Sequence, residues 1–300
     1  MGNSGLIIIR WVMMPKHGKE QEMRNQQKES GMVVNLHFTD FCNCRCRFCH
    51  SRFQRSRLGL ADWERIIDNI AGDLNVQRFN LAGGEPLASP FIQGLIDAIH
   101  DRGYDASIIT NGLLLNQEFI ARNIGKLSVI GISVDGVCAE DHKAIGRVNT
   151  RGESMTGERF VATARMIREA GMRLKVNTVV NALNKDKDFG EVLRVAMPDR
   201  WKVFRMLLLN GMNDDAADLA VTDDEFRDFV SRHRAYNPVV EDAGDIRSSY
   251  IVVNPDGKLI DNSSGSSATT DSLVGSRFRD EFAKIGFNFD AYLKRYVQAA

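Results

Sequence analysis

The sequence lacks a net charge, a long apolar segment and a dispersed set of cysteines. Lysine and arginine together number 39, and so do aspartate and glutamate. A general nucleic-acid binder needs a surplus of cations to displace counter-ions, so we expect no direct binding of DNA or RNA. The longest apolar run near the start covers nine residues, 6–14, and contains Arg10, whereas spanning a bilayer takes about 20. Neither a membrane anchor nor a secretory signal peptide is therefore expected.

Cysteine is sparse outside one short segment. Four of the five cysteines, Cys42, Cys44, Cys46 and Cys49, lie within eight residues, and Cys138 stands alone. Such crowding does not suit a disulfide framework in a chain of 300 residues. It indicates a metal site in a reducing compartment, so we expect a cytoplasmic protein.

The apolar pattern indicates the α/β fold class. From residue 32 onwards, short runs rich in β-branched residues alternate with amphipathic stretches, which is typical of βα units around a parallel sheet. Strands are predicted at 32–38, 77–82, 106–110, 128–134, 173–180 and 201–208, and helices at 60–72, 90–102, 116–124, 156–171 and 186–196. Six units are too few for a closed eight-stranded barrel, so we predict a partial (βα)6 TIM-like barrel of parallel strands.

Two further parts flank this barrel core, which covers 32–210. Residues 1–31 are predicted to be a mobile polar leader, because 15–31 carry no hydrophobic period. Residues 211–300 are predicted to be a C-terminal extension that caps the barrel mouth and covers the active site. Its expected elements are a helix near 222–235, a hairpin of 249–253 and 258–260, a flexible loop over the Ser/Thr-rich residues 262–272, and two short terminal helices.

The cysteine segment has the spacing Cys42-x3-Cys46-x2-Cys49 and directly follows the first predicted strand. The thiolates therefore belong at the carboxyl end of the sheet, where α/β barrels build their active sites. Thiolates hold iron–sulfur clusters, and three of them leave one iron of a four-iron cluster open. The alternative is a structural zinc site drawn from the four cysteines and His50, although no second ligand pair follows. Cys44 is left out of the predicted cluster ligands.

A second motif, Gly83-Gly84-Glu85-Pro86, follows the second predicted strand. Its glycines permit close approach of the backbone to a ligand, and Glu85 supplies a carboxylate at the same end of the sheet. By itself the motif also fits an ordinary strand-to-helix loop. Together with the three-cysteine loop it favours an iron–sulfur enzyme.

These two motifs resemble those of the radical S-adenosylmethionine (SAM) superfamily, which has this cysteine spacing, an aromatic residue before the last cysteine (Phe48) and a GGEP loop. Within the superfamily, the segments NLHFTDFCNCRCRFCH, ITNG, ISVDG, LKVNTVVN and RWKVFRMLL resemble those of viperin-like proteins, in the same order. The resemblance implies a [4Fe–4S] cluster on Cys42, Cys46 and Cys49, with SAM on its free iron. The SAM-binding residues that it implies are Phe48, Gly83, Gly84, Glu85, Asn111, Ser133 and Arg147.

Cations occur in the middle of predicted strands, where both faces of the sheet are buried and a charge is costly without a counter-ion. Because side chains alternate faces, Arg78, Lys175, Arg200 and Lys202 fit one surface that would suit a triphosphate. Pairing with local carboxylates is the competing explanation. By resemblance, these four cations bind the substrate triphosphate, with Asn35 and Asn80 as polar neighbours.

The resemblance also implies the reaction. A 5′-deoxyadenosyl radical would remove hydrogen from C4′ of a ribonucleoside triphosphate such as CTP, UTP or GTP, and loss of water would give a 3′-deoxy-3′,4′-didehydro nucleotide. Such a product would terminate RNA chains, which implies antiviral defence. Tyr250 would be a catalytic residue as well as a substrate contact, and a flavodoxin or ferredoxin the electron donor. Another radical SAM reaction, on a peptide or small molecule, and a non-enzymatic zinc scaffold remain alternatives.

Overall fold

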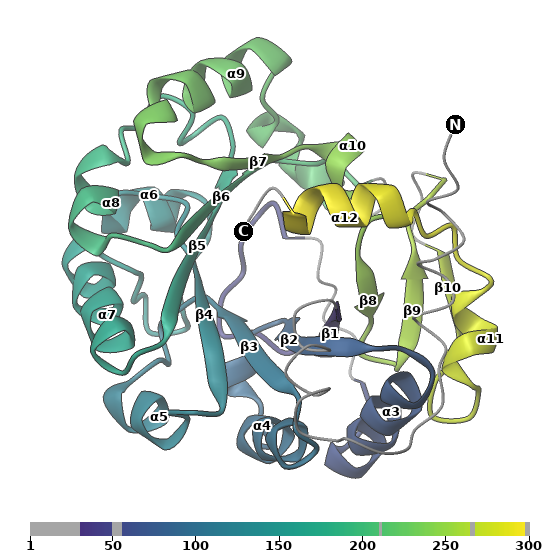
Figure 1. The fold of residues 1–300 in the computed structure, drawn as a ribbon. Coiled ribbons are helices and arrows are strands. Elements are labelled where there is room, and N and C mark those ends of the chain that lie inside the picture. Colours follow the sequence, from purple (N-terminus) through teal and green to yellow (C-terminus); the bar gives the residue numbers. More distant parts are fainter. Residues whose placement is uncertain (1–30, 50–55, 210–211, 265–267, 298–300) are drawn as a thin grey trace.

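Parallel strands laid side by side in chain order form the centre of the protein (Figure 1). The computed structural model describes residues 31–49, 56–209, 212–264 and 268–297. Within them one ten-stranded sheet has the order β10-β9-β8-β1-β2-β3-β4-β5-β6-β7. The strands are β1 (Met32–Thr39), β2 (Val76–Gly83), β3 (Asp105–Thr110), β4 (Leu127–Ser133), β5 (Arg173–Val180), β6 (Arg200–Arg205), β7 (Val239–Glu241), β8 (Ile251–Val253), β9 (Lys258–Asp261) and β10 (Ala268–Ser272). The two edges, β10 and β7, do not pair, so the barrel is partial as predicted.

Helices α3, α4, α5, α7 and α8 cover the outer face of the curved sheet, and shorter helices and α12 lie at its ends and edges (Figure 1). The helices of the described residues are α3 (Leu60–Asp73), α4 (Ile92–Asp101), α5 (Gln117–Arg122), α6 (Ala139–Ala144), α7 (Gly157–Glu169), α8 (Gly190–Ala196), α9 (Asp223–Arg232), α10 (Ala243–Ile246), α11 (Phe278–Phe282) and α12 (Phe289–Val297), with 3-10 turns η1 (Pro86–Ala88), η2 (Asp214–Leu219) and η3 (Arg234–Tyr236). None of the helices in the described part of the chain combines the length and the apolar character needed to cross a lipid bilayer.

Side-chain alternation gives the sheet two chemically different faces. Leu36 of β1, Phe79 of β2 and Val203 of β6 are fully buried and belong to one apolar core with Trp63 of α3. Each such side chain contributes roughly 1.5–3 kcal/mol by leaving water. Residues at the alternate positions point to the inner, concave face, so polar side chains on these strands collect there.

The six predicted strands and five predicted helices of the core are all present. Strand 173–180 has the predicted bounds, whereas β6 ends at Arg205 instead of residue 208, and α8 begins at Gly190 instead of residue 186. The residues before α8 form a turn in which the backbone N–H groups of Asn184 and Lys185 both donate to the carbonyl of Asn181. The short elements α6 and β7 were not predicted.

The C-terminal part extends the sheet. β8 pairs in parallel with β1 and forms the predicted hairpin with β9, in which the N–H of Gly257 donates to the carbonyl of Asn254. The prediction of a flexible loop over 262–272 was wrong for Ala268–Ser272, which forms β10 against β9. Thr270 accepts a hydrogen bond from the N–H of Leu259, so hydroxyl side chains that suggested flexibility help to pair the strand. Residues 265–267 of this stretch lie outside the described residues.

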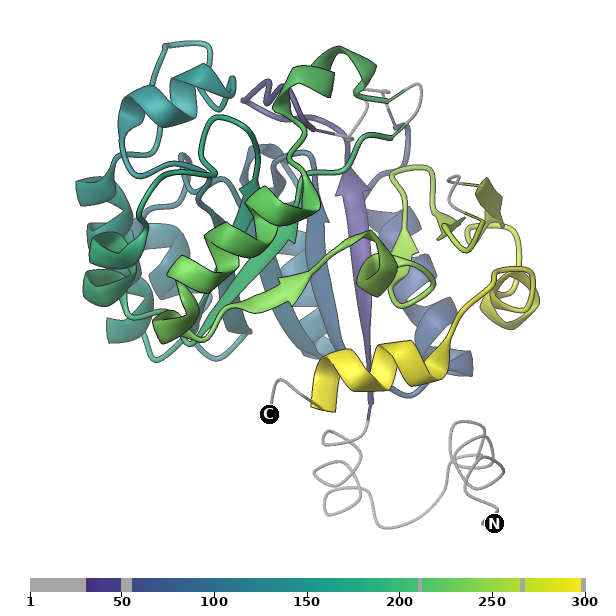
Figure 2. The ribbon, with the colours of Figure 1, turned by 90° about the horizontal axis from the view of Figure 1, so that it is seen from above.

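The helix α12 lies across the amino-terminal ends of the strands, opposite the cysteine loop (Figure 2). Tyr292 of α12 accepts a hydrogen bond of 2.8 Å from the N–H of Val33, at the beginning of β1. The extension was expected to cap the mouth at the other end. Within the extension, Ala216 and Leu219 of η2 pack against Phe48 of the cysteine loop, β8 to β10 continue the sheet, and α12 is on the amino-terminal side, so the cap over the mouth stays a prediction. The division of the chain at residue 210 stays a prediction, and the predicted leader lies outside the described residues except for Gly31.

Candidate active site

The cysteine loop follows β1 at the carboxyl end of the sheet, as predicted. A second loop braces it, because the N–H of Arg45 donates to the carbonyl of Gly146 and the N–H of Arg47 donates to that of Ile145. Inside the loop, the N–H of Cys44 donates to Sγ of Cys42 at 3.3 Å. The thiols therefore sit on backbone that is held from two sides.

The GGEP loop is hydrogen-bonded to the end of β1 and to the first residues of the cysteine loop. The N–H of Gly84 donates to the carbonyl of Thr39, and the N–H of Glu85 donates to that of Phe41, both at 2.7 Å. Gly83 has a φ of 129°, and a Cβ on Gly84 would collide with the carbonyl oxygen of Phe41. The sequence suggested that these glycines admit a ligand. In the structure they admit the neighbouring backbone, and their contact with SAM stays a prediction.

The buried carboxylate of Glu85 connects the loop after β2 with the end of β3. Its carboxylate accepts hydrogen bonds from the hydroxyl of Thr110 at 2.6 Å, and from the N–H groups of Asn111 at 2.7 Å and Leu87 at 3.1 Å. Burial raises the pKa of Glu85 to about 7, against the effect of these donors. The side chain of Asn111 continues from this carboxylate toward the thiols, since its Nδ2 lies 2.7 Å from Oδ1 of Asn43 and 3.6 Å from Sγ of Cys44.

Arg147 brings a buried positive charge to the thiols. Its guanidinium forms an ion pair with Asp135, donates to the carbonyl of Ser133 at 3.4 Å, and lies 6.0 Å from the ring centre of Phe48. A hydrogen bond from Cys44, supported by the charge of Arg147, lowers the pKa of Cys42 to about 6 despite burial. Burial raises the pKa of Cys46 to about 11, and Arg147 opposes that rise.

This loop fits an iron–sulfur cluster better than a zinc ion. Among the described residues, no three His, Cys, Asp or Glu side chains converge on one point that a single metal ion could occupy. Zinc needs four ligands around one point, whereas a cluster distributes its thiolates over several iron atoms. Cys42, Cys46 and Cys49 share one charged neighbourhood, because Arg147 interacts with each of them. His50, the other candidate zinc ligand, lies outside the described residues.

A chain of amides crosses the inner face of the sheet. Asn35 and Asn80 are register partners on β1 and β2, and Asn80 donates to Oδ1 of Asn35 at 2.9 Å. Asn80 accepts in turn from the hydroxyl of Ser107 on β3 at 2.8 Å, and Asn35 donates to the carbonyl of Ile251 at 3.1 Å. The structure therefore brings together the two predicted polar contacts and joins them to β8.

The four predicted cations lie on the same inner face. Lys175 is the register partner of Arg200, and Lys202 follows two residues after Arg200 on β6. Burial and the charges of Lys202, Arg200 and Arg78 all lower the pKa of Lys175 well below its ordinary value of 10.5. Arg78 has a local carboxylate at some distance, with 3.9 Å between its Nη1 and Oδ2 of Asp105. Local pairing, the competing explanation, therefore applies in part.

The predicted catalytic residue Tyr250 lies among these cations. Its hydroxyl accepts from Nζ of Lys202 at 3.0 Å and donates to Oε2 of Glu241 at 2.6 Å. Glu241 also forms an ion pair with Lys202. Burial lowers the pKa of Lys202 to about 8, although Glu241 raises it. The phenol is thus held between a cation and a carboxylate.

The structure adds Glu241 and Arg295 to the residues found from the sequence. The guanidinium of Arg295, on α12, lies 3.4 Å from the ring centre of Tyr250, and its Nε lies 3.4 Å from Oε1 of Glu241. No sequence pattern marks Glu241, on a strand of three residues. Arg295 ends the segment FDAYLKR (289–295), which also resembles a segment of viperin-like proteins, so this resemblance was a signal that could have identified it.

Asn177 connects the two ends of the site. It is the register partner of Ser133 on one side and of Lys202 on the other. Its buried Oδ1 has no hydrogen-bond partner within the described part of the chain. Ser133, through its carbonyl, reaches Arg147 beside the thiols. The inner face therefore runs from the cysteine loop through Ser133 and Asn177 to the cation cluster.

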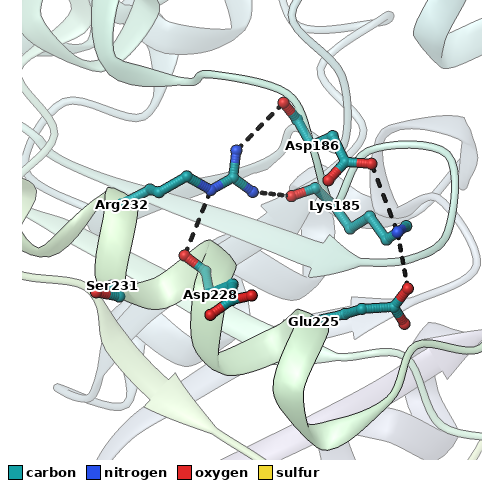
Figure 3. A pocket seen from close by; sticks show the side chains of 6 residues that line it. All are labelled: Lys185, Asp186, Glu225, Asp228, Ser231 and Arg232. Carbon is teal, nitrogen blue, oxygen red and sulfur yellow. Dashed lines mark hydrogen bonds and ion pairs between the residues drawn. The ribbon is translucent and has the colours of Figure 1, made fainter.

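A surface pocket of about 470 Å³ lies elsewhere, between α9 and the loop after β5 (Figure 3). Its lining residues are Lys185, Asp186, Glu225, Asp228, Ser231 and Arg232. Lys185 is paired with Glu225 at 2.7 Å, and Arg232 donates to the carbonyls of Lys185 and Asp186. None of the predicted site residues lines this pocket, and its two cations are already held by carboxylates or backbone carbonyls.

Comparisons with known proteins agree with this geometry. A family model described as the radical SAM superfamily matches residues 36–196. A protein of Selenomonas ruminantium, named S-adenosylmethionine-dependent nucleotide dehydratase, is 33% identical over 88% of this chain and 98% of its own length. A protein of the same name from Flammeovirga pacifica is 30% identical over 87% of this chain and 93% of its own length.

Solved structures show the same fold. SuiB of Streptococcus suis, in a complex with the precursor peptide SuiA, superposes with a TM-score of 0.68 over 96% of this chain and 76% of that chain, at 14% identity. This likeness confirms the predicted fold class and carries nothing about the substrate. The family match and the two bacterial relatives confirm the resemblance found in the sequence. The chain therefore belongs to the radical SAM superfamily and, within it, to the family of the S-adenosylmethionine-dependent nucleotide dehydratases.

Proposed function

We propose that this protein removes water from a ribonucleoside triphosphate and forms its 3′-deoxy-3′,4′-didehydro analogue. The observation that carries this proposal is the cluster of half-buried and buried cations on the inner face, facing the same interior as the cysteine loop. Lys175, Arg200 and Lys202 lie close together, and burial and the charges of its neighbours lower the pKa of Lys175, so a bound anion would favour its charged form. A triphosphate chain, with roughly four negative charges, supplies that anion through charge-assisted hydrogen bonds.

Cys42, Cys46 and Cys49 would hold a [4Fe–4S] cluster, and SAM would bind beside it. When bound, these groups supply a radical that removes the C4′ hydrogen. The chain's own part is to hold charge and orientation: Arg147 places a cation beside the thiols, and Asn111 directs its amide toward them. Ser133, Phe48, Gly83, Gly84 and Glu85 remain proposed SAM contacts.

The ribose has to lie between the two ends of the site. Asn35, Asn80 and Asn177 line the inner face and offer amide groups to sugar or phosphate oxygens. Arg78, Lys175, Arg200, Lys202 and Arg295 surround the phosphate end. Tyr250 stands at this end with its hydroxyl bonded to Glu241. We assign to its phenol the electron and proton that complete the reduction after the 3′-hydroxyl leaves as water.

The product lacks the 3′-hydroxyl that a polymerase extends, so it would terminate RNA chains. This chemistry supports a role in defence against viruses or phages. A one-electron donor such as flavodoxin or ferredoxin is required, because both the cleavage of SAM and the final reduction consume an electron. The peptide-modifying alternative is less well supported, since residues 139–300 contain no cysteine for additional clusters.

An anaerobic assay tests the proposal directly. The reconstituted protein is incubated with dithionite, SAM and one of the four ribonucleoside triphosphates at a time. We expect one of them to accelerate the release of 5′-deoxyadenosine and to yield a nucleotide lighter by one water. Release of 5′-deoxyadenosine that no triphosphate accelerates would retain the radical SAM chemistry and refute the substrate.

A further inference from the structure

Glu241 is a buried carboxylate inside a cluster of cations. Its side chain is 3% exposed, and that of Lys202, its ion-pair partner, is 4% exposed. The second oxygen accepts the hydrogen bond from Tyr250, and Nε of Arg295 lies 3.4 Å from the first. Burial raises the pKa of Glu241, but Lys202 and Arg295 outweigh it and hold the pKa below the ordinary value. The carboxylate is therefore ionised at neutral pH, with its charge held by Lys202 and Arg295.

This charge lies where the proposed substrate places its phosphates. Five cations surround that region, namely Arg78, Lys175, Arg200, Lys202 and Arg295. Glu241 pairs with Lys202 and lies close to Arg295, whereas Asp105 pairs with Arg78. Glu241 faces the centre of the cluster, so a bound phosphate chain would experience its repulsion.

In the proposed reaction, this repulsion affects the release of the product. Dehydration changes the ribose and leaves the three phosphates as they were, so the cations bind substrate and product alike. Interactions of that kind lower the free energy of both complexes equally and do not accelerate the reaction. Without Glu241, the buried charges of Lys202 and Arg295 would bind the phosphates of the product as tightly as those of the substrate, and the site would retain its product.

We propose that Glu241 is an internal counter-ion that weakens the binding of the triphosphate chain and so permits the product to leave. The proposal rests on the proposed function, because it takes the cation cluster to be the phosphate site. Glu241 stabilises the ligand-free protein by neutralising Lys202 and Arg295. When the phosphates bind, they share these two cations with it, and the remaining like-charge repulsion limits the affinity.

Replacement of Glu241 by glutamine removes the charge and keeps the shape. The probe is inorganic tripolyphosphate, followed by CTP, titrated calorimetrically into the reconstituted protein without SAM or reductant. We expect Glu241→Gln to bind tripolyphosphate tighter by roughly tenfold or more. Its thermal unfolding temperature should fall without the ligand and rise by more than that of the wild type on ligand addition. Equal or weaker binding would overturn the proposal and make Glu241 a residue that positions Lys202.

Two variants control for shape and for burial. Glu241→Asp keeps the charge and should retain the wild-type affinity within about threefold; tightening equal to that of the glutamine variant would show that charge is not the cause. Glu281→Gln alters a carboxylate that is equally buried but remote, on α11, and should leave the affinity unchanged. A change there as large as at Glu241 would likewise overturn the proposal.

A charge-compensated pair makes the test independent of the stability of Glu241→Gln. Arg295→Gln alone should bind tripolyphosphate more weakly than the wild type. The double variant Arg295→Gln/Glu241→Gln should bind it more tightly than Arg295→Gln, and the reverse order would contradict the proposal. If the wild type bound neither tripolyphosphate nor CTP, the triphosphate site itself would be refuted. Failure of the proposed function is thereby distinguished from failure of the proposal for Glu241.

Discussion

The hydroxyl of Tyr250 and the carboxylate of Glu241 are joined by a hydrogen bond of 2.6 Å, which links the residue before β8 to the edge strand β7. The same hydroxyl accepts from Lys202 on β6. Oxidation of a phenol makes its proton strongly acidic, so a Tyr250 that gives up an electron would also release the proton that the proposed loss of the 3′-hydroxyl as water requires. The arrangement thus suits a tyrosine that supplies an electron.

Tyr250→Phe tests that role. We expect the affinity for the triphosphate to fall by no more than about a hundredfold, because a hydrogen bond to a charged group contributes roughly 1.5–3 kcal/mol. The amount of dehydrated nucleotide formed per 5′-deoxyadenosine should fall much further, since hydrogen abstraction proceeds without the final reduction. Tyr236→Phe, on the outer surface, is the matched control and should leave the ratio unchanged. An unchanged ratio in Tyr250→Phe would remove the phenol from the reaction.

Binding of the triphosphate should be coupled to proton uptake. Burial and neighbouring cations favour the neutral amine of Lys175 in the ligand-free protein, which is why its pKa is lowered. A bound anion favours the ammonium form and raises this pKa, so a proton is taken up whenever the pH lies between the free and bound values. Lys202, with a pKa of about 8, adds to the uptake.

Calorimetric titration with the triphosphate at about pH 8, in two buffers of different ionisation enthalpy, measures this uptake. We expect a net gain of protons, weaker binding as the pH rises above the bound-state pKa, and a smaller gain in Lys175→Met. Lys175→Ala should weaken triphosphate binding and leave the cluster intact. A binding enthalpy that is identical in both buffers would show that no lysine titrates.

The cysteine loop allows the ligand set to be separated residue by residue. Cys46→Ala should lose the cluster and abolish SAM cleavage, because each ligand of a three-thiolate site binds a different iron. Cys44→Ser should retain the iron content, and Cys138→Ala, which alters the residue before α6, is the matched control. Iron and sulfide analysis of the purified variants gives the result. Loss of iron in Cys44→Ser with retention in Cys46→Ala would reverse the assignment.

Gly84→Ala should displace the cysteine loop without unfolding the barrel. The added Cβ meets the carbonyl of Phe41, which is backbone and cannot move aside without the loop. We expect a folded protein with reduced iron content. Gly72→Ala is the control, since open space surrounds that position in α3, and it should stabilise the protein by about 0.5–1 kcal/mol. Circular dichroism and iron analysis distinguish the two, and full iron content in Gly84→Ala would contradict this reading.

Much of the fold and of the site follows from local patterns. The β-branched runs predict the strands, and the period of two along β2, β5 and β6 places Arg78, Lys175 and Lys202 on one face, as the structure shows them. The cysteine and GGEP motifs adjoin predicted strand ends, so their meeting at the carboxyl edge of the sheet was also predictable.

The rest depends on contacts between distant segments. Glu241 and Arg295 belong to the site because they contact Lys202 and Tyr250 in the folded chain. No local sequence pattern pairs a three-residue strand with a C-terminal helix. The composition of 262–272 indicated a loop. Strand propensity is a property of the residues alone and does not include the hydrogen bonds that β9 offers to β10. The glycines of GGEP were predicted to contact a ligand. Their actual contact with the backbone of Thr39 joins two segments that are distant in the sequence, so no local pattern indicates it.

The pairing of β1 with β8 has a consequence for how the chain is made. The amide of Asn35 bonds to the carbonyl of Ile251, 216 residues further along the chain. While a ribosome synthesises the intervening units, β1 pairs with β2 on one side and presents a bare edge on the other. That edge is a template for unwanted strands until β8 emerges. We therefore expect the nascent chain to need protection at this edge, and the phosphate-binding end to be the last part of the enzyme to form.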